Sequence, residues 1–275
     1  MEKIKIIATD LDGTLLDSEK RLSEENRAAL QRAADMGIEI VPTTGRIYAI
    51  VPEAVRQLPF IRYAITGNGA EVYDVKNDRV IAKNEMPWEK AVEIMAFLDG
   101  FDVVYDCYQD GWGYMTAEHL NKVENYISIP QFIEIYARSR KPVPELKSYL
   151  RQQGKGVQKF QLCTTDQKLR MYLLEELEKR FSDVVFHCVL PYNIEVNALN
   201  CHKGAALETL CGYLGCTMEN VMTFGDGQND ITMLQMAGIS FAMENAAPEV
   251  KAAAKYITGN CDESGVAQAI NKFCF

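Results

Sequence analysis

The sequence lacks any apolar run that approaches the roughly 18 residues of a membrane-spanning helix, so we expect no transmembrane segment and no membrane partner. Glu2, Lys3 and Lys5 interrupt its start, and Asp10 ends the apolar stretch that follows, so no hydrophobic region of a signal peptide is predicted. The eight cysteines include no Cys-x-x-Cys pair. We therefore expect reduced thiols in a cytoplasmic protein.

Basic residues are also fewer than acidic residues. The chain has 29 Lys and Arg residues against 38 Asp and Glu residues, which gives a formal net charge of −9. Such a chain is a poor candidate for binding nucleic acid through its overall field, so we expect no nucleic-acid partner. A small anionic molecule can still bind wherever local cations or a metal ion reverse the sign of the charge.

Strands and helices alternate at the two ends of the chain, whereas the middle has another character. The alternation predicts parallel strands in a doubly wound, Rossmann-like sheet. In the middle, Asp110-Gly111 between two strand-like runs predicts a β-hairpin beside helices, an α+β arrangement. We therefore predict an α/β protein whose core domain comprises residues 1–84 and 191–275, with residues 85–190 inserted as a second, α+β domain.

Local signals place the individual elements. Ser23 is expected to cap a helix that ends near Met36. The strands expected in the core are residues 4–8, 38–41, 63–66, 193–196, 221–224, 239–242 and 256–258. The other expected core helices are 48–58, 203–214, 230–236, 248–254 and a last one from residue 263. The insert is expected to contain helices at 87–98, 130–140, 144–153 and 166–181 and strands at 103–109, 112–116, 157–163 and 184–189.

The most informative motif is Asp10-Leu11-Asp12-Gly13-Thr14, directly after the strand expected at residues 4–8. Parallel α/β sheets place their ligands outside the carboxyl ends of the strands, where these two carboxylates would lie. One carboxylate can act as a nucleophile and the other as an acid and base, which suits phosphoryl transfer through an aspartyl-phosphate. Taken alone, the two residues could equally cap a helix or lie solvated in a loop.

Three further motifs follow other expected strands. Thr43-Thr44-Gly45-Arg46 offers a hydroxyl and backbone N–H groups that can hold phosphate oxygens, although Thr44 could merely cap a helix. Lys203 opens a helix, where a solvated surface charge is the ordinary interpretation. Gly225–Asp230 contains Asp226, Asn229 and Asp230. Taken alone, Asp226 and Asp230 would be turn and cap residues.

Taken together, these motifs pose an electrostatic problem that a cation solves. At about 4 Å and an effective dielectric constant near 20, two like unit charges repel by about 4 kcal/mol. A cluster of Asp10, Asp12, Asp226 and Asp230 would therefore repel a phosphate unless cations intervene. Mg²⁺, a hard ion that takes carboxylate and phosphate oxygens, is the expected cofactor, and Lys203 would supply a second positive charge.

The four motifs resemble those of the haloacid dehalogenase (HAD) superfamily, and within it the Cof-type sugar-phosphate phosphatases. The resemblance covers nearly the whole chain and implies that the insert is a substrate-specificity cap. It also implies a role for each motif residue, in four groups. Asp10 would be the nucleophile and Asp12 the acid and base, while Thr44 and Lys203 would stabilise the transition state. Gly45, Arg46 and Asn229 would bind phosphate. Asp10, Asp226 and the Asp12 carbonyl would bind the metal, and Asp230 would support it indirectly.

By this resemblance the chain is a Mg²⁺-dependent phosphatase of small phosphorylated metabolites, with sugar phosphates expected first. Pyridoxal phosphate and flavin mononucleotide remain alternative substrates. A sugar phosphomutase is a second enzyme hypothesis, in which a sugar hydroxyl takes the place of water. A non-catalytic phosphate-binding regulator is the third, although its usual mark would be a broken motif. The sequence makes no prediction of the oligomeric state.

Overall fold

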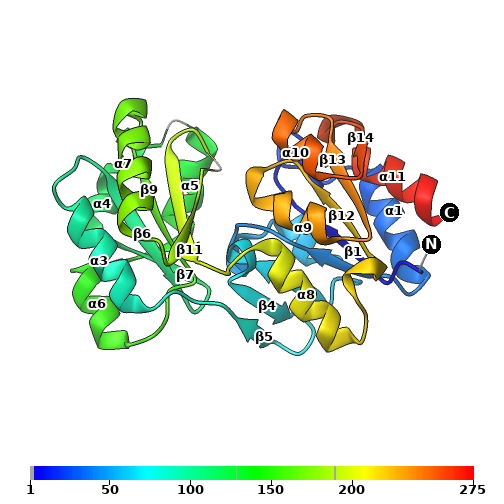
Figure 1. Cartoon of the computed structure of the whole chain (residues 1–275), viewed down its shortest axis with the longest axis horizontal. Coiled ribbons are helices and arrows are strands. Elements are labelled where there is room, and N and C mark those ends of the chain that lie inside the picture. The colour runs from blue at the N-terminus through cyan, green and yellow to red at the C-terminus, as the bar shows by residue number, and fades with distance from the viewer. Residues whose placement is uncertain (1–2, 128, 189) are drawn as a thin grey trace. The chain divides into compact units, whose positions relative to one another are not determined.

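The computed structural model describes residues 3–127, 129–188 and 190–275, which form two compact units (Figure 1). Unit 1 comprises Met1–Arg46, Val51–Lys83 and His202–Phe275. Unit 2 comprises Ile47–Ile50 and Asn84–Cys201. The division expected from the sequence placed residues 47–50, 84 and 191–201 in the core, whereas they lie in unit 2. Among the described residues, no helix combines the length and apolar character needed to cross a membrane.

Unit 1 is built on a five-stranded parallel sheet with the order β14-β13-β12-β1-β2. Strand β1 pairs with β12 on one side and β2 on the other, so that Ala8 lies opposite both Thr223 and Val41. Parallel bridges from β2 lead on to β3, which starts a separate antiparallel sheet with β4 and β5. The strands are β1 (Ile6–Thr9), β2 (Glu39–Pro42), β3 (Tyr63–Thr66), β4 (Glu71–Asp74), β5 (Arg79–Lys83), β12 (Val221–Gly225), β13 (Ile239–Met243) and β14 (Tyr256–Thr258).

Helices pack on this parallel sheet, which confirms the α/β class. The apolar side chains of α8 and α9 form one core cluster with Ile6, Ala8 and Val41 from the strands. Elsewhere α1 and α11 lie side by side (Figure 1), joined by the buried Asn26 side chain, which accepts from Ala267 N at 2.9 Å. The helices of unit 1 are α1 (Glu24–Asp35), α2 (Glu53–Arg56), α8 (Lys203–Leu214), α9 (Ile231–Met236), α10 (Pro248–Ala253) and α11 (Gly265–Cys274).

One helix expected in the core is wrong, and one hairpin of unit 1 was missed. The helix expected at residues 48–58 is a 3₁₀ turn at Tyr48–Ile50 followed by the short α2. Pro52 is the N-cap of α2, and the proline ring disfavours helical geometry at the residue before it, so one helix cannot run through this segment. The hairpin of β4 and β5 was not expected from the sequence.

Unit 2 contains a six-stranded sheet with the order β10-β11-β9-β6-β7-β8. The pairs are antiparallel except for β7 with β8. Alternate residues of β6, β9 and β11 point to opposite faces, and one face packs on α3, α6 and α7. The elements of unit 2 are α3 (Trp88–Leu98), β6 (Val104–Gln109), β7 (Trp112–Thr116), α4 (Ala117–Lys122), α5 (Pro130–Ser139), β8 (Arg140–Val143), α6 (Leu146–Gln153), β9 (Lys159–Cys163), α7 (Gln167–Arg180), β10 (Val184–His187) and β11 (Asn193–Ala198).

Three outcomes in unit 2 correct the expected elements. The strand expected at 193–196 in the core is β11, which pairs with β9 and β10 and so joins the unit 2 sheet. The helix expected at 130–140 ends at Ser139, and Arg140 begins β8 instead, where its side chain forms a buried ion pair with Asp106. The strand expected at 184–189 ends at His187, and residue 189 lies outside the described residues.

Candidate active site

The centre of the site is a fully buried lysine between two aspartates of unit 1. Asp10 follows β1, and Lys203 is the first residue of α8. The Lys203 ammonium lies 2.5 Å from Asp10 Oδ1 and 2.5 Å from Asp230 Oδ1. Burial alone would lower the pKa of Lys203, but the two carboxylates hold it above its usual value. The lysine is therefore a permanent positive charge beneath the carboxyl end of β1.

The turn that carries Asp10 and Asp12 is held by both backbone and packing. Leu16 N donates to Leu11 O at 2.9 Å, and both leucine side chains are buried. Gly13 has a φ of +85°, and a Cβ there would lie 2.5 Å from Asp226 Oδ2. Thr14 donates its hydroxyl to Asp226 Oδ1 at 2.6 Å, which ties this turn to the end of β12.

Three carboxylates of this site have the chemistry of a cation site. Each of Asp10, Asp226 and Asp230 offers an oxygen, and these oxygens lie within 4.8 Å of one another. Burial raises the pKa of Asp10 well above its usual value, and Lys203 offsets this only in part. Burial and the charge of Asp230 likewise raise the pKa of Asp226 to about 6. A hard divalent cation would relieve this repulsion, so the donor set fits one.

The Asp230 side chain has little room for a direct bond to a metal. Its Oδ1 accepts from Lys203, and its Oδ2 accepts from the backbone N–H groups of Asp226 and Gly227 at 3.0 and 2.9 Å. These contacts fit the supporting role that the resemblance implies for Asp230. Asp226 and the second oxygen of Asp10 are the better placed ligands.

The Asp12 side chain is paired with two cations. Arg46 donates to both of its oxygens at 2.7 Å, and the Lys20 ammonium lies 3.1 Å from Oδ1. Burial alone would raise the pKa of Asp12, but hydrogen bonds and charge from Arg46 and Lys20 hold it below its usual value. Asp12 is therefore an ionised carboxylate here, about 30% exposed.

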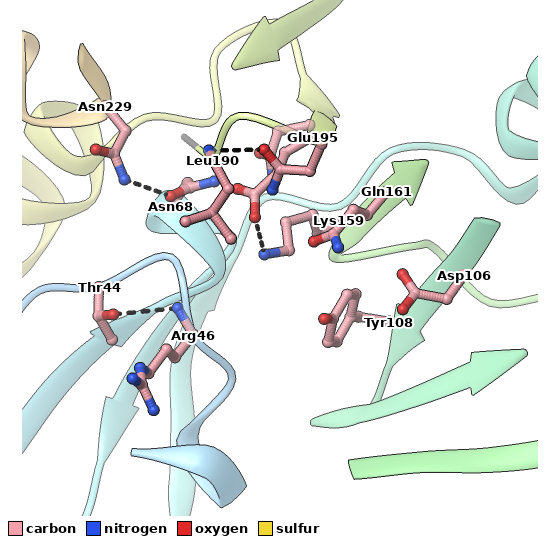
Figure 2. A network of polar contacts seen from close by, with 12 residues as sticks. Thr44, Arg46, Asn68, Asp106, Tyr108, Lys159, Gln161, Leu190, Glu195 and Asn229 are labelled. Atoms are coloured by element: carbon pink, nitrogen blue, oxygen red, sulfur yellow. Dashed lines mark hydrogen bonds and ion pairs between the residues drawn. The ribbon is translucent and has the colours of Figure 1, made fainter. Parts of the chain in front are cut away.

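The remaining predicted residues are Thr44, Gly45, Arg46 and Asn229. They lie near a second buried turn, Gly67–Gly69, whose Asn68 is labelled in Figure 2. Thr44 Oγ1 accepts from Arg46 N at 3.1 Å, so its hydroxyl shapes the turn after β2 rather than capping a regular helix. Gly45 lies against Asn68, and a Cβ at Gly45 would be 2.6 Å from Asn68 Oδ1. The Asn229 amide donates to the same Asn68 oxygen at 3.0 Å.

All nine predicted site residues thus lie in unit 1, on turns or helix starts at the carboxyl ends of its strands. The sequence argument missed Lys20 and Asn68, each in direct contact with a predicted residue. The sequence did carry a signal for Asn68, because Gly67-Asn68-Gly69 is typical of a turn with positive φ. The structure shows such a turn, with φ of +62° at Asn68. Lys20 carried none, because a lysine in a polar loop has many uses.

The raised pKa of Asp226 makes a testable prediction about stability without metal. A folded-state pKa near 6, against 3.8 for the ordinary carboxyl, means that protonation favours the fold. This contribution is complete below about pH 4 and is lost as the pH rises through about 6. In EDTA, Asp226→Asn should therefore gain stability over the wild type between pH 4 and 7.5, by at most roughly 3 kcal/mol. Urea unfolding at several pH values measures this, and a pH-independent difference would contradict it.

The family is decided by a match along almost the whole chain. The profile of the haloacid dehalogenase-like hydrolases matches residues 7–270. The chain belongs to this family. Its similarity to phosphatases of the family confirms the expected enzyme class, a phosphoric monoester hydrolase.

Individual relatives agree along their full length. A Bacillus subtilis protein named 5-amino-6-(5-phospho-D-ribitylamino)uracil phosphatase YcsE is 36% identical over 97% of this chain and 94% of its own. A solved haloacid dehalogenase-like hydrolase from Bacteroides thetaiotaomicron superposes with a TM-score of 0.84 at 29% identity, covering 98% of this chain and 99% of its own. The solved subclass IIB sugar phosphatase BT4131 has a TM-score of 0.82 at 25% identity, covering 98% and 99%.

Proposed function

We propose that this protein is a Mg²⁺-dependent phosphatase that hydrolyses small phosphorylated metabolites through an aspartyl-phosphate on Asp10. The observation that carries the proposal is the buried Lys203 between Asp10 and Asp230, with Asp226 beside them. A nucleophilic carboxylate must meet a phosphate dianion, and this arrangement supplies one fixed positive charge and a set of cation ligands at the meeting point.

The proposed reaction has two steps, and the same two carboxylates act in both. A carboxylate oxygen of Asp10 attacks phosphorus, forming an Asp10–phosphate bond as the bond to the leaving oxygen breaks. Asp12 gives a proton to that leaving oxygen. Asp12 then takes a proton from water, which attacks phosphorus, releases inorganic phosphate and regenerates Asp10. Lys203, Thr44 and Asn229 hold the phosphate oxygens throughout.

The metal ion would be held by Asp10, Asp226 and the backbone carbonyl of Asp12, with Asp230 supporting it. When bound, a divalent ion neutralises charge on the transferring phosphoryl group. The raised pKa values of Asp10 and Asp226 support this assignment, because two buried carboxylates that favour protonation are a costly arrangement without a cation.

Arg46 has two roles in this proposal. In the structure its guanidinium holds Asp12 ionised, which is the form that serves as a base. Phosphate is a strong competitor for a guanidinium, since both make paired, charge-assisted hydrogen bonds. We expect Arg46 to leave Asp12 for the incoming phosphate, which would let Asp12 carry the proton that the leaving oxygen needs.

The proposed substrates are monophosphates of small polar molecules, such as sugar phosphates or a phosphoribitylaminouracil. The names of YcsE and of the sugar phosphatase BT4131 support this class. Unit 2 is the proposed cap that selects among them. Its sheet carries polar side chains on the face opposite the packed helices, including the ion pair between Lys159 and Glu195 at 2.7 Å (Figure 2).

A substrate panel tests the proposal. The wild-type protein with Mg²⁺ should release phosphate from at least one compound in a panel of sugar phosphates, phosphoribityl compounds, pyridoxal phosphate and flavin mononucleotide. EDTA should abolish the release, and added Mg²⁺ should restore it, because the carboxylate cluster needs its cation. Folded, Mg²⁺-loaded protein that releases phosphate from none of them would contradict the proposal and favour a mutase or a binding protein.

A further inference from the structure

The Gly67-Asn68-Gly69 turn after β3 has no part in the reaction described so far, yet it lies among the motif turns. Asn68 is about 1% exposed. Its backbone N–H donates to Thr44 O at 3.1 Å, and the neighbouring Gly67 N–H donates to Arg46 O at 2.9 Å. Two backbone hydrogen bonds thus fasten the turn to the Thr44–Arg46 segment.

The Asn68 side chain makes a second connection, to the turn after β12. Asn229 Nδ2 donates to Asn68 Oδ1 at 3.0 Å, and both side chains are buried (Figure 2). An amide group has two N–H bonds, so Asn229 Nδ2 keeps one N–H for another acceptor. With one N–H committed to Asn68, the rotation of the Asn229 amide is fixed, and the direction of the other N–H is fixed with it.

Two features show that this geometry is specific to Asn68. Its backbone is in the left-handed region, at φ +62° and ψ +20°, which favours Asn or Gly over other residues. Its Oδ1 also lies where any side chain at position 45 would collide, at 2.6 Å from an added Cβ. The space that Gly45 leaves open is therefore filled by the oxygen that holds Asn229.

We propose that Asn68 is a positioning residue that orients the Asn229 amide toward the phosphate group. This inference rests on the proposed function, in which Asn229 contacts phosphate. Asn68 itself touches neither substrate nor metal in this scheme. It acts by fixing which hydrogen of Asn229 is free to donate, and it does so from a turn that is anchored to the Thr44 segment.

The test measures binding of inorganic phosphate to the Mg²⁺-loaded protein by isothermal titration calorimetry, so that no turnover is required. Asn68→Gly removes the side chain and keeps a backbone that tolerates positive φ. We expect it to weaken phosphate binding about tenfold, the effect of losing one well-placed hydrogen bond. Asn68→Ala should weaken binding equally but lower the melting temperature more, because alanine is strained at this φ.

A double variant separates positioning from general structural support. If Asn68 acts through Asn229, Asn229→Ala should weaken binding by a similar factor, and adding Asn68→Gly should cost nothing further. Asn220→Ala is the matched control. Asn220 is also a buried asparagine of unit 1, but it precedes β12 at the other end of that strand and hydrogen-bonds to Lys3 O and Thr217 N. It should lower the melting temperature and leave phosphate binding unchanged.

The contradicting results are distinct. Unchanged phosphate affinity in Asn68→Gly, or losses from Asn68→Gly and Asn229→Ala that multiply, would overturn the inference and leave the proposed function standing. Wild-type protein that neither binds phosphate nor releases it from any substrate would overturn the proposed function, and the inference with it.

Discussion

Replacing Asp10 with Asn is expected to lower kcat by at least about 10⁴-fold while leaving the protein folded. The amide has nearly the shape of the carboxylate but offers no nucleophilic oxygen to phosphorus. It is also uncharged, so it removes a buried anion whose pKa burial already raises. Steady-state phosphate release on the best panel substrate, with circular dichroism and a melting curve, measures both effects.

The control for this variant is Asp17→Asn. Asp17 lies on the same loop and accepts from Arg21 and from backbone N–H groups, but it belongs to none of the proposed catalytic contacts. It should retain nearly full activity. Residual activity of a tenth or more in folded Asp10→Asn would show that another group attacks phosphorus.

Replacing Lys203 with Met is expected to damage both stability and activity. The ammonium is fully buried and bridges Asp10 and Asp230 at 2.5 Å each, so its loss leaves two buried carboxylates without their counter-ion. Breaking a buried ion pair in this way costs about 3–5 kcal/mol. The melting temperature of the metal-free protein should fall by roughly 10 °C, and kcat should fall by roughly 10³-fold.

A surface ion pair gives the comparison. Lys122 pairs with Glu118 at 2.7 Å, but both side chains are more than half exposed. Because such pairs contribute about 1 kcal/mol or less, Lys122→Met should change the melting temperature little. High Mg²⁺ should recover part of the stability lost in Lys203→Met, since a cation bound by the remaining carboxylates stabilises the fold. If metal-free Lys203→Met melted at the same temperature as the wild type, the proposed charge balance would be contradicted.

Much of the site could be predicted from the sequence because its residues follow short, strongly apolar strands. A motif such as Asp10–Thr14 is placed by the strand before it, and parallel strands bring their carboxyl ends to one edge of the sheet. The same reasoning predicted that Asp226 and Asp230 lie near Asp10. These are local signals joined by one topological rule.

The rest depended on tertiary contacts that no local pattern contains. The strand before Lys203 was assigned to the core, whereas β11 pairs within unit 2. Only the partner strands decide such a question, since a single apolar run fits either sheet. The hydrogen bond between Asn68 and Asn229 joins residues 161 positions apart, so their pairing has no signature in either segment.

The side-chain partners of Asp12 show the same limit. Its position on the turn was predictable, but its partners were not. Arg46 and Lys20 bind its carboxylate, whereas Asp10, Asp226 and Asp230 form the group that could hold a metal ion. Two carboxylates two residues apart therefore have opposite environments: burial raises the pKa of Asp10, whereas cations lower that of Asp12.

The most direct test of the proposal is to trap the phosphorylated aspartate. Borohydride reduces an acyl phosphate to an alcohol, which would convert Asp10 to homoserine in protein quenched during turnover. Mass spectrometry of the peptide should find this change at Asp10 in the presence of substrate and Mg²⁺, and should not find it with EDTA or without substrate. Turnover with an unmodified Asp10, or reduction at a different carboxylate, would contradict the proposal that phosphate passes through Asp10.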